Sequence, residues 1–470
     1  MKKIFLILSF VLLWAVWYFT FPYLLIWLEG CSFFSTLPDA TFINYRLPGE
    51  LPAYIGAFLL QFFARPAVGA AVQALLAVLF VYGLTVIVER IFKKGASLFW
   101  VVMPALPVYL YHQIGDHTLS LSVLLTLVSL TAALLAFLLT FRKKGFLSLP
   151  DFMYNRYLAV VIFAISAGTV LYVAYDDNSN VREYEDVARL EYLADHGEWD
   201  MILESVSHRD ALRNDYSRKY SLLALSETGK LTEEAFAYGL SSSEDFLFKN
   251  TQIPFAKNFN IRFYLCAGMK NAAIYNIYEQ SMQPVSGMTF KALRMLADIY
   301  LEVGDYTLAK KYMDIIAHTH SHGRWLEERQ PMLESIKDVV PDYSFKDDRF
   351  MLESFFLDMS EMADRYKADR KYADYLLCGL LADKDGNRFY QLFQVIAKTL
   401  YPDGMGIPEL YQEALLLVAA QNEDVLKTYP IEKKVWDRFV GFNELMGEGK
   451  TADAESRYAD TYWTYIYRLQ

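Results

Sequence analysis

The feature that most limits how this chain can fold is the confinement of its long apolar runs to the first 175 residues. The runs lie at residues 4–27, 66–88, 97–113, 118–141 and 157–175. Most of them are long enough to cross the roughly 30 Å apolar core of a bilayer. The hydrophobic content of 54% lies between the values typical of soluble proteins and of proteins embedded throughout in a membrane. The sequence therefore predicts a membrane helix bundle over residues 1–175, followed by a soluble part.

The two parts also differ in charge. Residues 1–175 contain 11 Lys and Arg against 6 Asp and Glu, whereas the remainder contains 34 against 49, and the whole chain has a net charge of −10. Because phosphate binding needs a basic surface, this acidic second part argues against nucleic acid as a partner. The partner predicted for the first part is the lipid bilayer.

Basic residues predict the orientation of the bundle, because Lys and Arg collect on the cytoplasmic side. The clusters are Lys2 with Lys3, Arg90 with Lys93 and Lys94, and Arg142 with Lys143, Lys144 and Arg156. Five crossings place every cluster on the cytoplasmic side and residues 176–470 outside. We therefore expect a multi-pass protein of the cytoplasmic (inner) membrane, with a cytoplasmic N-terminus and an extracytoplasmic C-terminal part.

Two segments do not fit a simple crossing. The run "LPAYIGAFLLQFF" at residues 51–63 is short, and counting it as a crossing would move Arg90 and its neighbours outside. It is predicted to be an interfacial or re-entrant helix. The run at 97–113 is also short and contains Pro104 and Pro107, which predict a kinked helix.

Polar residues near a membrane are candidates for function, because burying them is costly. The candidate cluster consists of Glu50, Gln61, Arg65, His112, Asp116 and His117. A structural interpretation stands beside the functional one. The "HQIGDH" stretch lies between two crossings, where a polar hairpin is expected in any case, and Arg65 can reach lipid headgroups.

After residue 183 the hydrophobic pattern has a helical period, and short helices recur around Gly-containing turns. The clearest unit is "LRMLADIYLEVGDYTLAKKYMDII" at 293–316, in which small residues such as Ala297 and Ala309 allow two helices to cross closely. It resembles a tetratricopeptide repeat. Weaker copies lie at residues 190–203, 221–236, 263–279 and 442–468.

The predicted fold class is all-α, with a transmembrane bundle of about five crossings followed by a tetratricopeptide-like α-solenoid. "PDYSFKDDR" at 341–349 is a charged, Pro-containing break. It divides the second part into a repeat domain over 176–340 and a helical-repeat extension over 341–470.

Three stretches carry a wider resemblance: "LPGELPAYIGAFLLQFF", "WLEER" after a repeat, and "YLLCGLLADKDGNRFYQLF" at 375–393. With them the chain resembles an uncharacterised bacterial family of multi-pass membrane proteins with a repeat tail. The resemblance implies the same architecture and leaves the activity open.

The stretch "AHTHSHGRW" at 317–325 contains His318, His320 and His322 and raises the question of a metal site. Only an extended chain would project all three to one side, and zinc would still need a fourth ligand. Histidines near a helix C-terminus also interact favourably with the helix dipole. We therefore predict a helix end and no metal ligand here.

No catalytic motif is apparent in the sequence, which has no Gly-rich phosphate loop, nucleophile elbow or paired Cys motif. We predict no catalytic residue, no cofactor-binding residue and no cofactor. The aromatic tail "YADTYWTYIY" at 458–467 either stacks sugars or packs the last helix onto its neighbour, and packing is the commoner use of such a pattern.

The preferred functional prediction is a membrane-anchored interaction protein whose repeat region binds a protein, peptide or cell-envelope polymer outside the cytoplasmic membrane. The alternative is a cell-envelope enzyme, such as a membrane glycosyltransferase acting on a lipid-linked sugar. Glu29, Asp39 and Glu50 are the carboxylates that such an enzyme would have available on its first outer loop.

Overall fold

The structure is a computed structural model of the full chain. It describes residues 2–37, 50–141, 145–176, 180–249, 251, 253–282, 287–344, 354–420 and 424–468. Within these ranges the regular elements are all helices, together with one isolated bridge between Phe92 and Leu147. The predicted all-α class is confirmed for this part of the chain.

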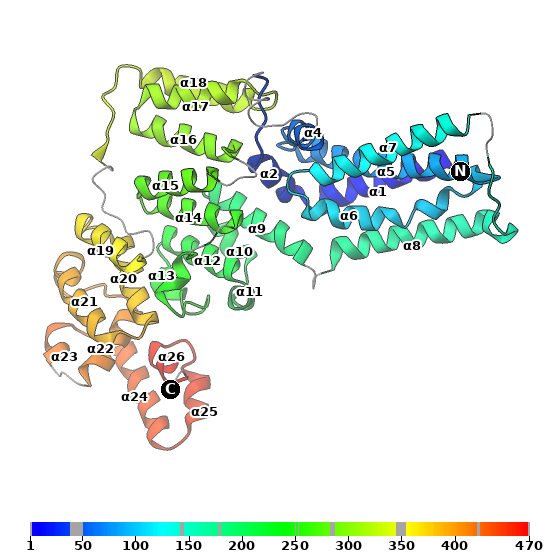
Figure 1. Ribbon diagram of the computed structural model, residues 1–470. Helices are drawn as coiled ribbons and strands as arrows, with labels where there is room; N and C mark the ends of the chain where they lie inside the picture. The colour runs from blue at the N-terminus through cyan, green and yellow to red at the C-terminus, as the bar shows by residue number, and fades with distance from the viewer. Residues whose placement is uncertain are drawn as a thin grey trace. The chain divides into compact units, whose positions relative to one another are not determined.

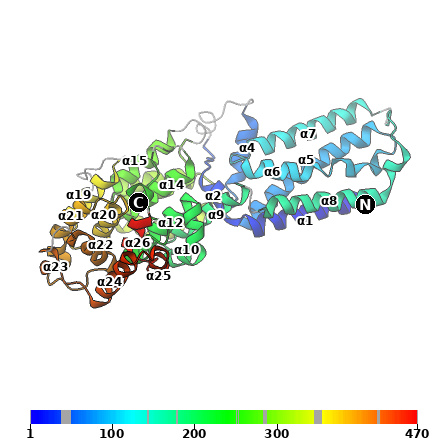
Figure 2. The same cartoon turned by 90° about the horizontal axis from the view of Figure 1, so that it is seen from below.

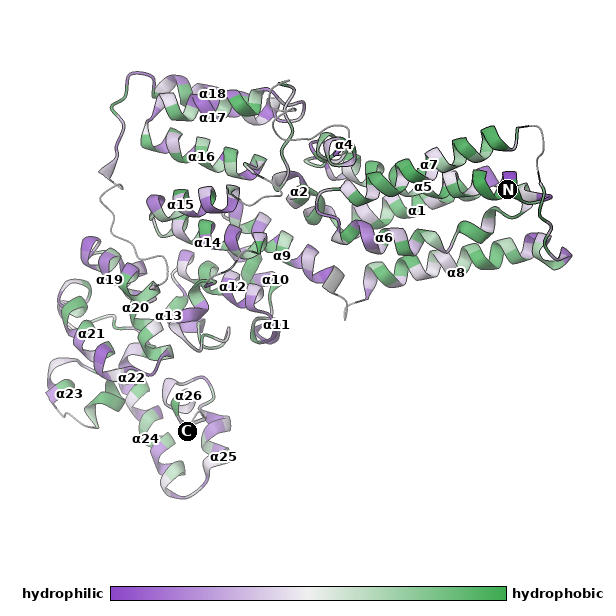
Figure 3. Ribbon diagram, viewed as in Figure 1, coloured by the Kyte–Doolittle hydropathy of each residue, from purple (hydrophilic) through white to green (hydrophobic). Residues whose placement is uncertain are grey.

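Four helices are long and apolar enough to cross a membrane. They are α1 (Lys2–Thr20), α5 (Pro66–Ile91), α7 (Ser120–Leu139) and α8 (Arg156–Tyr175). They lie side by side, with α5 packed against both α1 and α7 (Figure 1, Figure 2). Apolar residues predominate along all four, whereas hydrophilic and apolar residues alternate along the helices after residue 180 (Figure 3). Four of the five predicted crossings are thus present as long apolar helices.

The predicted crossing at 97–113 has a different form. It consists of the 3-10 turns η1 (Gly95–Ser97) and η2 (Phe99–Val102), followed by α6 (Ala105–Gly115) after Pro104. At 11 residues α6 is about 16 Å long, too short to cross a bilayer as a helix. The sequence predicts that the prolines kink one continuous helix. Instead, α6 begins only after Pro104, and Pro107 lies in its first turn.

The path of the chain nevertheless crosses the length of the bundle between α5 and α7. The guanidinium of Arg90 lies 3.9 Å from the ring centre of Phe137, and the Lys93 amide donates to the Leu147 carbonyl at 2.7 Å. The C-terminal ends of α5 and α7 therefore share one end of the bundle, and the two helices run in parallel. Residues 95–115 must return the chain to the other end before α7 begins.

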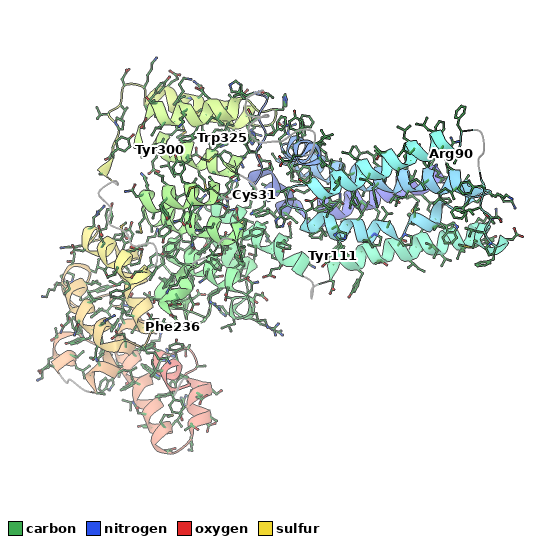
Figure 4. All side chains as sticks on the ribbon, in the orientation of Figure 1. Cys31, Arg90, Tyr111, Phe236, Tyr300 and Trp325 are labelled. Carbon is green, nitrogen blue, oxygen red and sulfur yellow. The ribbon has the colours of Figure 1, made fainter. Side chains whose placement is uncertain are left out.

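Basic residues gather at this shared end of the bundle. Lys2 Nζ lies 2.7 Å from Glu89 Oε1, and Lys94 Nζ lies 5.4 Å from the ring centre of Tyr154. Figure 4 labels Arg90 at this end and Cys31, which follows α2, at the other. Arg142, Lys143 and Lys144 lie outside the described residues.

The first apolar run is two helices. After α1 the chain breaks at Phe21, and α2 (Pro22–Gly30) begins with a proline. Proline has no backbone N–H and cannot continue a helix without a break, so Pro22 ends the first crossing earlier than the predicted residue 27.

The run at 51–63 forms a short apolar helix, α4 (Leu51–Leu60), as expected for a segment that does not cross. It packs against α7. A side chain at Gly56 would come within 2.5 Å of the Thr118 carbonyl oxygen, so this contact requires glycine.

Each Gly turn predicted after residue 183 joins two helices. The pairs are α9 (Asn180–Asp195) with α10 (Trp199–Ser205), α12 (Asp215–Glu227) with α13 (Leu231–Glu234), α14 (Pro254–Cys266) with α15 (Lys270–Ser281), α16 (Phe290–Val303) with α17 (Tyr306–Ala317), and α24 (Lys433–Gly447) with α25 (Thr451–Arg457). In every turn the glycine has a positive φ, between 70° and 81°. A sixth pair, α20 (Arg370–Ala382) with α21 (Gly386–Leu400), places Lys384 at φ 60° instead.

The pair α16 and α17 shows why these helix pairs form. Gly304 takes the left-handed conformation that ends α16, and the Asp305 carboxylate accepts from the Leu308 amide at 2.9 Å to begin α17. Ala297 and Ala309 are fully buried between the two helices. The turn at Gly304 and the small residues between the two helices lie where the sequence predicts them.

The remaining helices complete the chain. They are η3 (Asp151–Tyr154), α11 (His208–Arg213), η4 (Ser243–Phe246), α18 (Gly323–Ser335), α19 (Phe355–Arg365), α22 (Glu409–Ala419), α23 (Asp424–Thr428) and α26 (Tyr462–Arg468). By internal contacts the chain forms two compact units. The first comprises residues 1–189 and 277–343, and the second comprises residues 190–276 and 344–470. The pair α16–α17 and helix α18 thus belong to the same unit as the apolar helices.

Candidate functional sites

The histidine stretch lies in the connection between α17 and α18. His318 directly follows α17 and, like His320, is exposed, whereas His322 precedes α18 and is only 3% exposed. The three side chains do not converge. In the described ranges no group of three or more His, Cys, Asp or Glu side chains is placed to hold a metal ion.

His322 instead meets a carboxylate from the other end of the sequence. Its Nε2 lies 2.5 Å from Oε1 of Glu29, in the last turn of α2. Oε2 of the same carboxylate accepts from Arg294 Nη2 of α16 at 3.1 Å. Glu29 is 1% exposed, and the centre of the Phe290 ring lies 4.3 Å from that of the imidazole, so the carboxylate and the imidazole are closed to water, whereas Arg294 is partly exposed.

Glu29 is held as a carboxylate. Burial alone would raise its pKa, but the Arg294 charge and the hydrogen bond from His322 outweigh that effect and lower the pKa. Because an ionised carboxylate only accepts hydrogen bonds, Nε2 of His322 carries a proton. The cluster is therefore a buried ion pair that joins α2 to α16 and to the start of α18.

The second ring nitrogen of His322 faces two hydroxyl groups. Thr319 Oγ1 lies 2.9 Å from Nδ1 and donates its own proton to the Ile316 carbonyl, so it can accept from a protonated Nδ1. Ser321 Oγ, at 3.2 Å, can donate to an unprotonated Nδ1. Both charge states of the imidazole therefore find hydrogen-bond partners.

The N-terminal end of α2 is held by another buried carboxylate. Glu185 of α9 accepts from the backbone amides of Tyr23 at 3.1 Å and of Leu24 at 2.8 Å. Helix N-termini leave such amides without partners inside the helix, and the carboxyl oxygens of Glu185 accept from them. Burial raises the pKa of Glu185 to about 8, while the two amides act in the opposite sense. Helix α2 is thus fastened at both ends by buried side chains distant in sequence.

The six residues of the predicted polar cluster are distributed over several places. Glu50 and Arg65 are exposed just before α4 and α5, and His112 is exposed in the last turn of α6. Gln61 is fully buried, and its Oε1 accepts from the His320 amide at 3.0 Å. The side-chain amide of Gln61 therefore ties the end of α4 to the histidine stretch.

Asp116 and His117 shape the turn between α6 and α7. Asp116 Oδ2 accepts from both the amide and the hydroxyl of Ser122, at 2.8 and 2.9 Å, which fixes the first turn of α7. The His117 ring packs edge-on against Trp27 and Tyr184, and burial lowers its pKa. His117 thus contacts α2, whereas Asp116 forms hydrogen bonds only with the nearby start of α7.

The second unit contains a cavity of about 800 Å³. Its lining comes from α13 and the turn after it, from α20, from α22 and the loop before it, from α24, and from the start of α26. Phe236 and Tyr465 supply aromatic rings, whose centres are 4.7 Å apart. Glu413 and Arg438 are among the charged side chains.

The aromatic tail has two roles in this unit. Trp463 is 2% exposed and packs edge-on against Phe439 and near Phe442, as expected for a stripe that holds the last helix in place. Tyr465 is half-buried and lines the cavity. Trp463 therefore packs α26 against α24, whereas Tyr465 also lines the cavity.

Comparison with known proteins adds one finding. The model of a family of unknown function (DUF6057) matches residues 1–175 and 152–468. The chain belongs to this family. No curated protein and no solved structure matches it. The match to DUF6057 covers Glu29, Arg294 and His322 as well as every residue of the cavity, so both sites lie inside the family's own extent.

Proposed function

We propose that this member of DUF6057 is a membrane-anchored interaction protein whose helical-repeat region binds a protein, peptide or cell-envelope polymer outside the cytoplasmic membrane. The observation that carries the proposal is the cavity in the second unit. Its volume of about 800 Å³ lies within the range of ligand sites, and its lining offers both aromatic and charged side chains to a bound molecule. Successive helix pairs with left-handed Gly turns support a tetratricopeptide-like solenoid, an architecture that builds binding grooves.

The outward position of the repeat region is supported by the bundle. Lys2, Arg90, Lys94 and Arg156 belong to predicted cytoplasmic clusters, and contacts of Lys2, Arg90 and Lys94 place them at one end. Five passages between the two ends, counting the return through residues 95–115, leave the chain after α8 at the opposite end. This position corresponds to the outer side of an inner membrane.

The alternative function is an envelope glycosyltransferase. One of the three carboxylates proposed for it, Glu29, is unavailable. Glu29 is closed to water and bound to both His322 and Arg294, so it is not available to a substrate. Glu50 is exposed, and Asp39 lies outside the described residues. No observation favours this alternative over binding.

The test is site-specific photo-crosslinking in living cells. A photoreactive amino acid replaces Ala237, an exposed residue in the cavity lining, or Ala452, an exposed residue of α25 outside it. We expect a discrete adduct that depends on illumination at position 237 and none at position 452. The absence of an adduct at 237, or the same adducts at both positions, would contradict the proposal.

A further inference from the structure

We infer that the cavity in the second unit binds the cationic side chain of a lysine-bearing peptide. This inference rests on the proposed function and names the chemistry of its ligand. Carboxylates predominate in the cavity lining, where they outnumber the basic side chains by five to two. The acidic residues are Glu233, Glu409, Glu413, Glu432 and Asp460, and the basic ones are Arg370 and Arg438.

The two arginines do not offer their charge to an anion. Arg438 Nη2 lies 2.6 Å from Asp460 Oδ1, and its Nη1 lies 3.8 Å from Glu409 Oε2. Arg370 donates to Asp374 Oδ2 at 3.0 Å and to Thr232 Oγ1 at 2.9 Å. Both guanidinium groups are therefore committed to protein acceptors, and Lys434 Nζ lies 2.6 Å from Glu409 Oε1. Among the described residues, Glu233, Glu413 and Glu432 form no ion pair, and they give the space its excess of acidic groups.

Glu413 is the member of this lining that most needs a cation. It is 4% exposed, and one of its oxygens accepts from the Tyr462 amide at 2.7 Å. Among the described residues no basic side chain forms an ion pair with it. Burial raises the pKa of Glu413 to about 7, with Arg438 opposing and Asp460 and Glu409 adding to the rise. A ligand ammonium at this point would supply the missing charge.

Aromatic rings stand next to this carboxylate. The Tyr462 ring centre lies 5.7 Å from that of Phe236, and Phe236 lies edge-on to Tyr465. Phe236 and Tyr465 are both half-buried, so part of each ring is open to the cavity. Such rings accommodate the alkyl stem of a lysine and attract its ammonium group. The lining thus combines an apolar wall for the stem with a carboxylate for the charge.

The size of the cavity favours a peptide over a small free amine. A volume of about 800 Å³ lies in the upper part of the range of about 300–1,000 Å³ for ligand pockets. Acidic side chains come from α13, from the first two turns of α22, from the residue before α24 and from the connection to α26, so they are spread around the space. A segment with several lysines matches that spread.

The experiment measures fluorescence anisotropy of labelled trilysine with the full chain in detergent, beside labelled triglutamate and trialanine. We expect trilysine to bind and the other two peptides not to. Glu413→Gln keeps an oxygen for the Tyr462 amide but removes the charge, and it should weaken trilysine binding by about tenfold or more. Glu448→Gln, at an exposed residue outside the cavity, should leave the affinity unchanged.

Glu233→Lys provides a second variant that does not disturb a buried group, because Glu233 is exposed in the lining. It should also weaken trilysine binding. Unchanged affinity in both cavity variants, or equal binding of trialanine, would overturn the inference. Spermine binding as tight as trilysine would overturn the assignment to a peptide. If any of these results came with a crosslinked adduct at position 237, only the lysine inference would fail and the proposed function would remain. The lack of that adduct would contradict the proposed function itself.

Discussion

Glu29 and His322 illustrate how a site can be visible in the sequence residue by residue and still not be predictable as a pair. An acidic residue close to the end of a long apolar run is energetically unfavourable unless its charge is satisfied, so Glu29 is a candidate functional residue. A histidine-rich stretch is likewise a candidate site. The two lie 293 residues apart, however, and no periodicity or motif spacing connects them. Gln61 and His320, 259 residues apart, are a second pair of this kind.

The buried pair gives a prediction at the residue scale. Glu29→Gln leaves the Arg294 charge without its carboxylate, and breaking a buried ion pair typically costs about 3–5 kcal/mol. We expect a clearly lower midpoint of thermal unfolding for the variant in detergent. Glu327→Gln, at an exposed position of α18, should change the midpoint little. Equal midpoints for Glu29→Gln and the unmodified protein would mean that the pair contributes nothing to stability.

Among the elements, the helix pairs could be predicted well because their signals are local. A Gly at the turn, small residues at the crossing and larger ones around them all lie within about 25 residues, as in α16 and α17. The apolar segments were harder, because length and hydropathy do not show how a proline divides a run. Pro22 separates α1 from α2, and Pro104 precedes a helix too short to cross. The sixth pair escaped prediction because its turn uses Lys384 in place of glycine.

Ala309 provides the test at this scale. Its side chain is fully buried between α16 and α17, so Ala309→Trp must push the helices apart. Overpacking of this kind typically costs about 1–3 kcal/mol, and here the inserted group is larger than in most measured cases. We expect a lower unfolding midpoint than for Thr307→Trp, an exposed position of the same helix. Equal midpoints for the two tryptophan variants would contradict the close helix crossing.

At the scale of the whole molecule, the sequence predicts a change of character near residue 175, where the apolar helices end. The division of the chain into compact units could not be predicted from composition. Residues 277–343 belong to the same compact unit as the apolar helices, fastened through Arg294 and His322 to Glu29. The junction at residues 343 and 344 falls within the range of the break predicted at 341–349, of which residues 345–349 lie outside the described part of the chain. The cavity was not predictable, because its lining is assembled from elements spread over more than 200 residues.

In the proposed topology, five passages of the chain place the helical-repeat region outside the cytoplasmic membrane. It depends on residues 95–115, which return the chain along the bundle without forming a long helix. Alkaline phosphatase fusions at residues 45, 93, 116, 145 and 200 test it directly, because the enzyme is active only after export. We predict activity at 45, 116 and 200 and none at 93 and 145. Activity at 145 with none at 116 and 200 would mean four crossings, would place the repeat region in the cytoplasm, and would contradict the account.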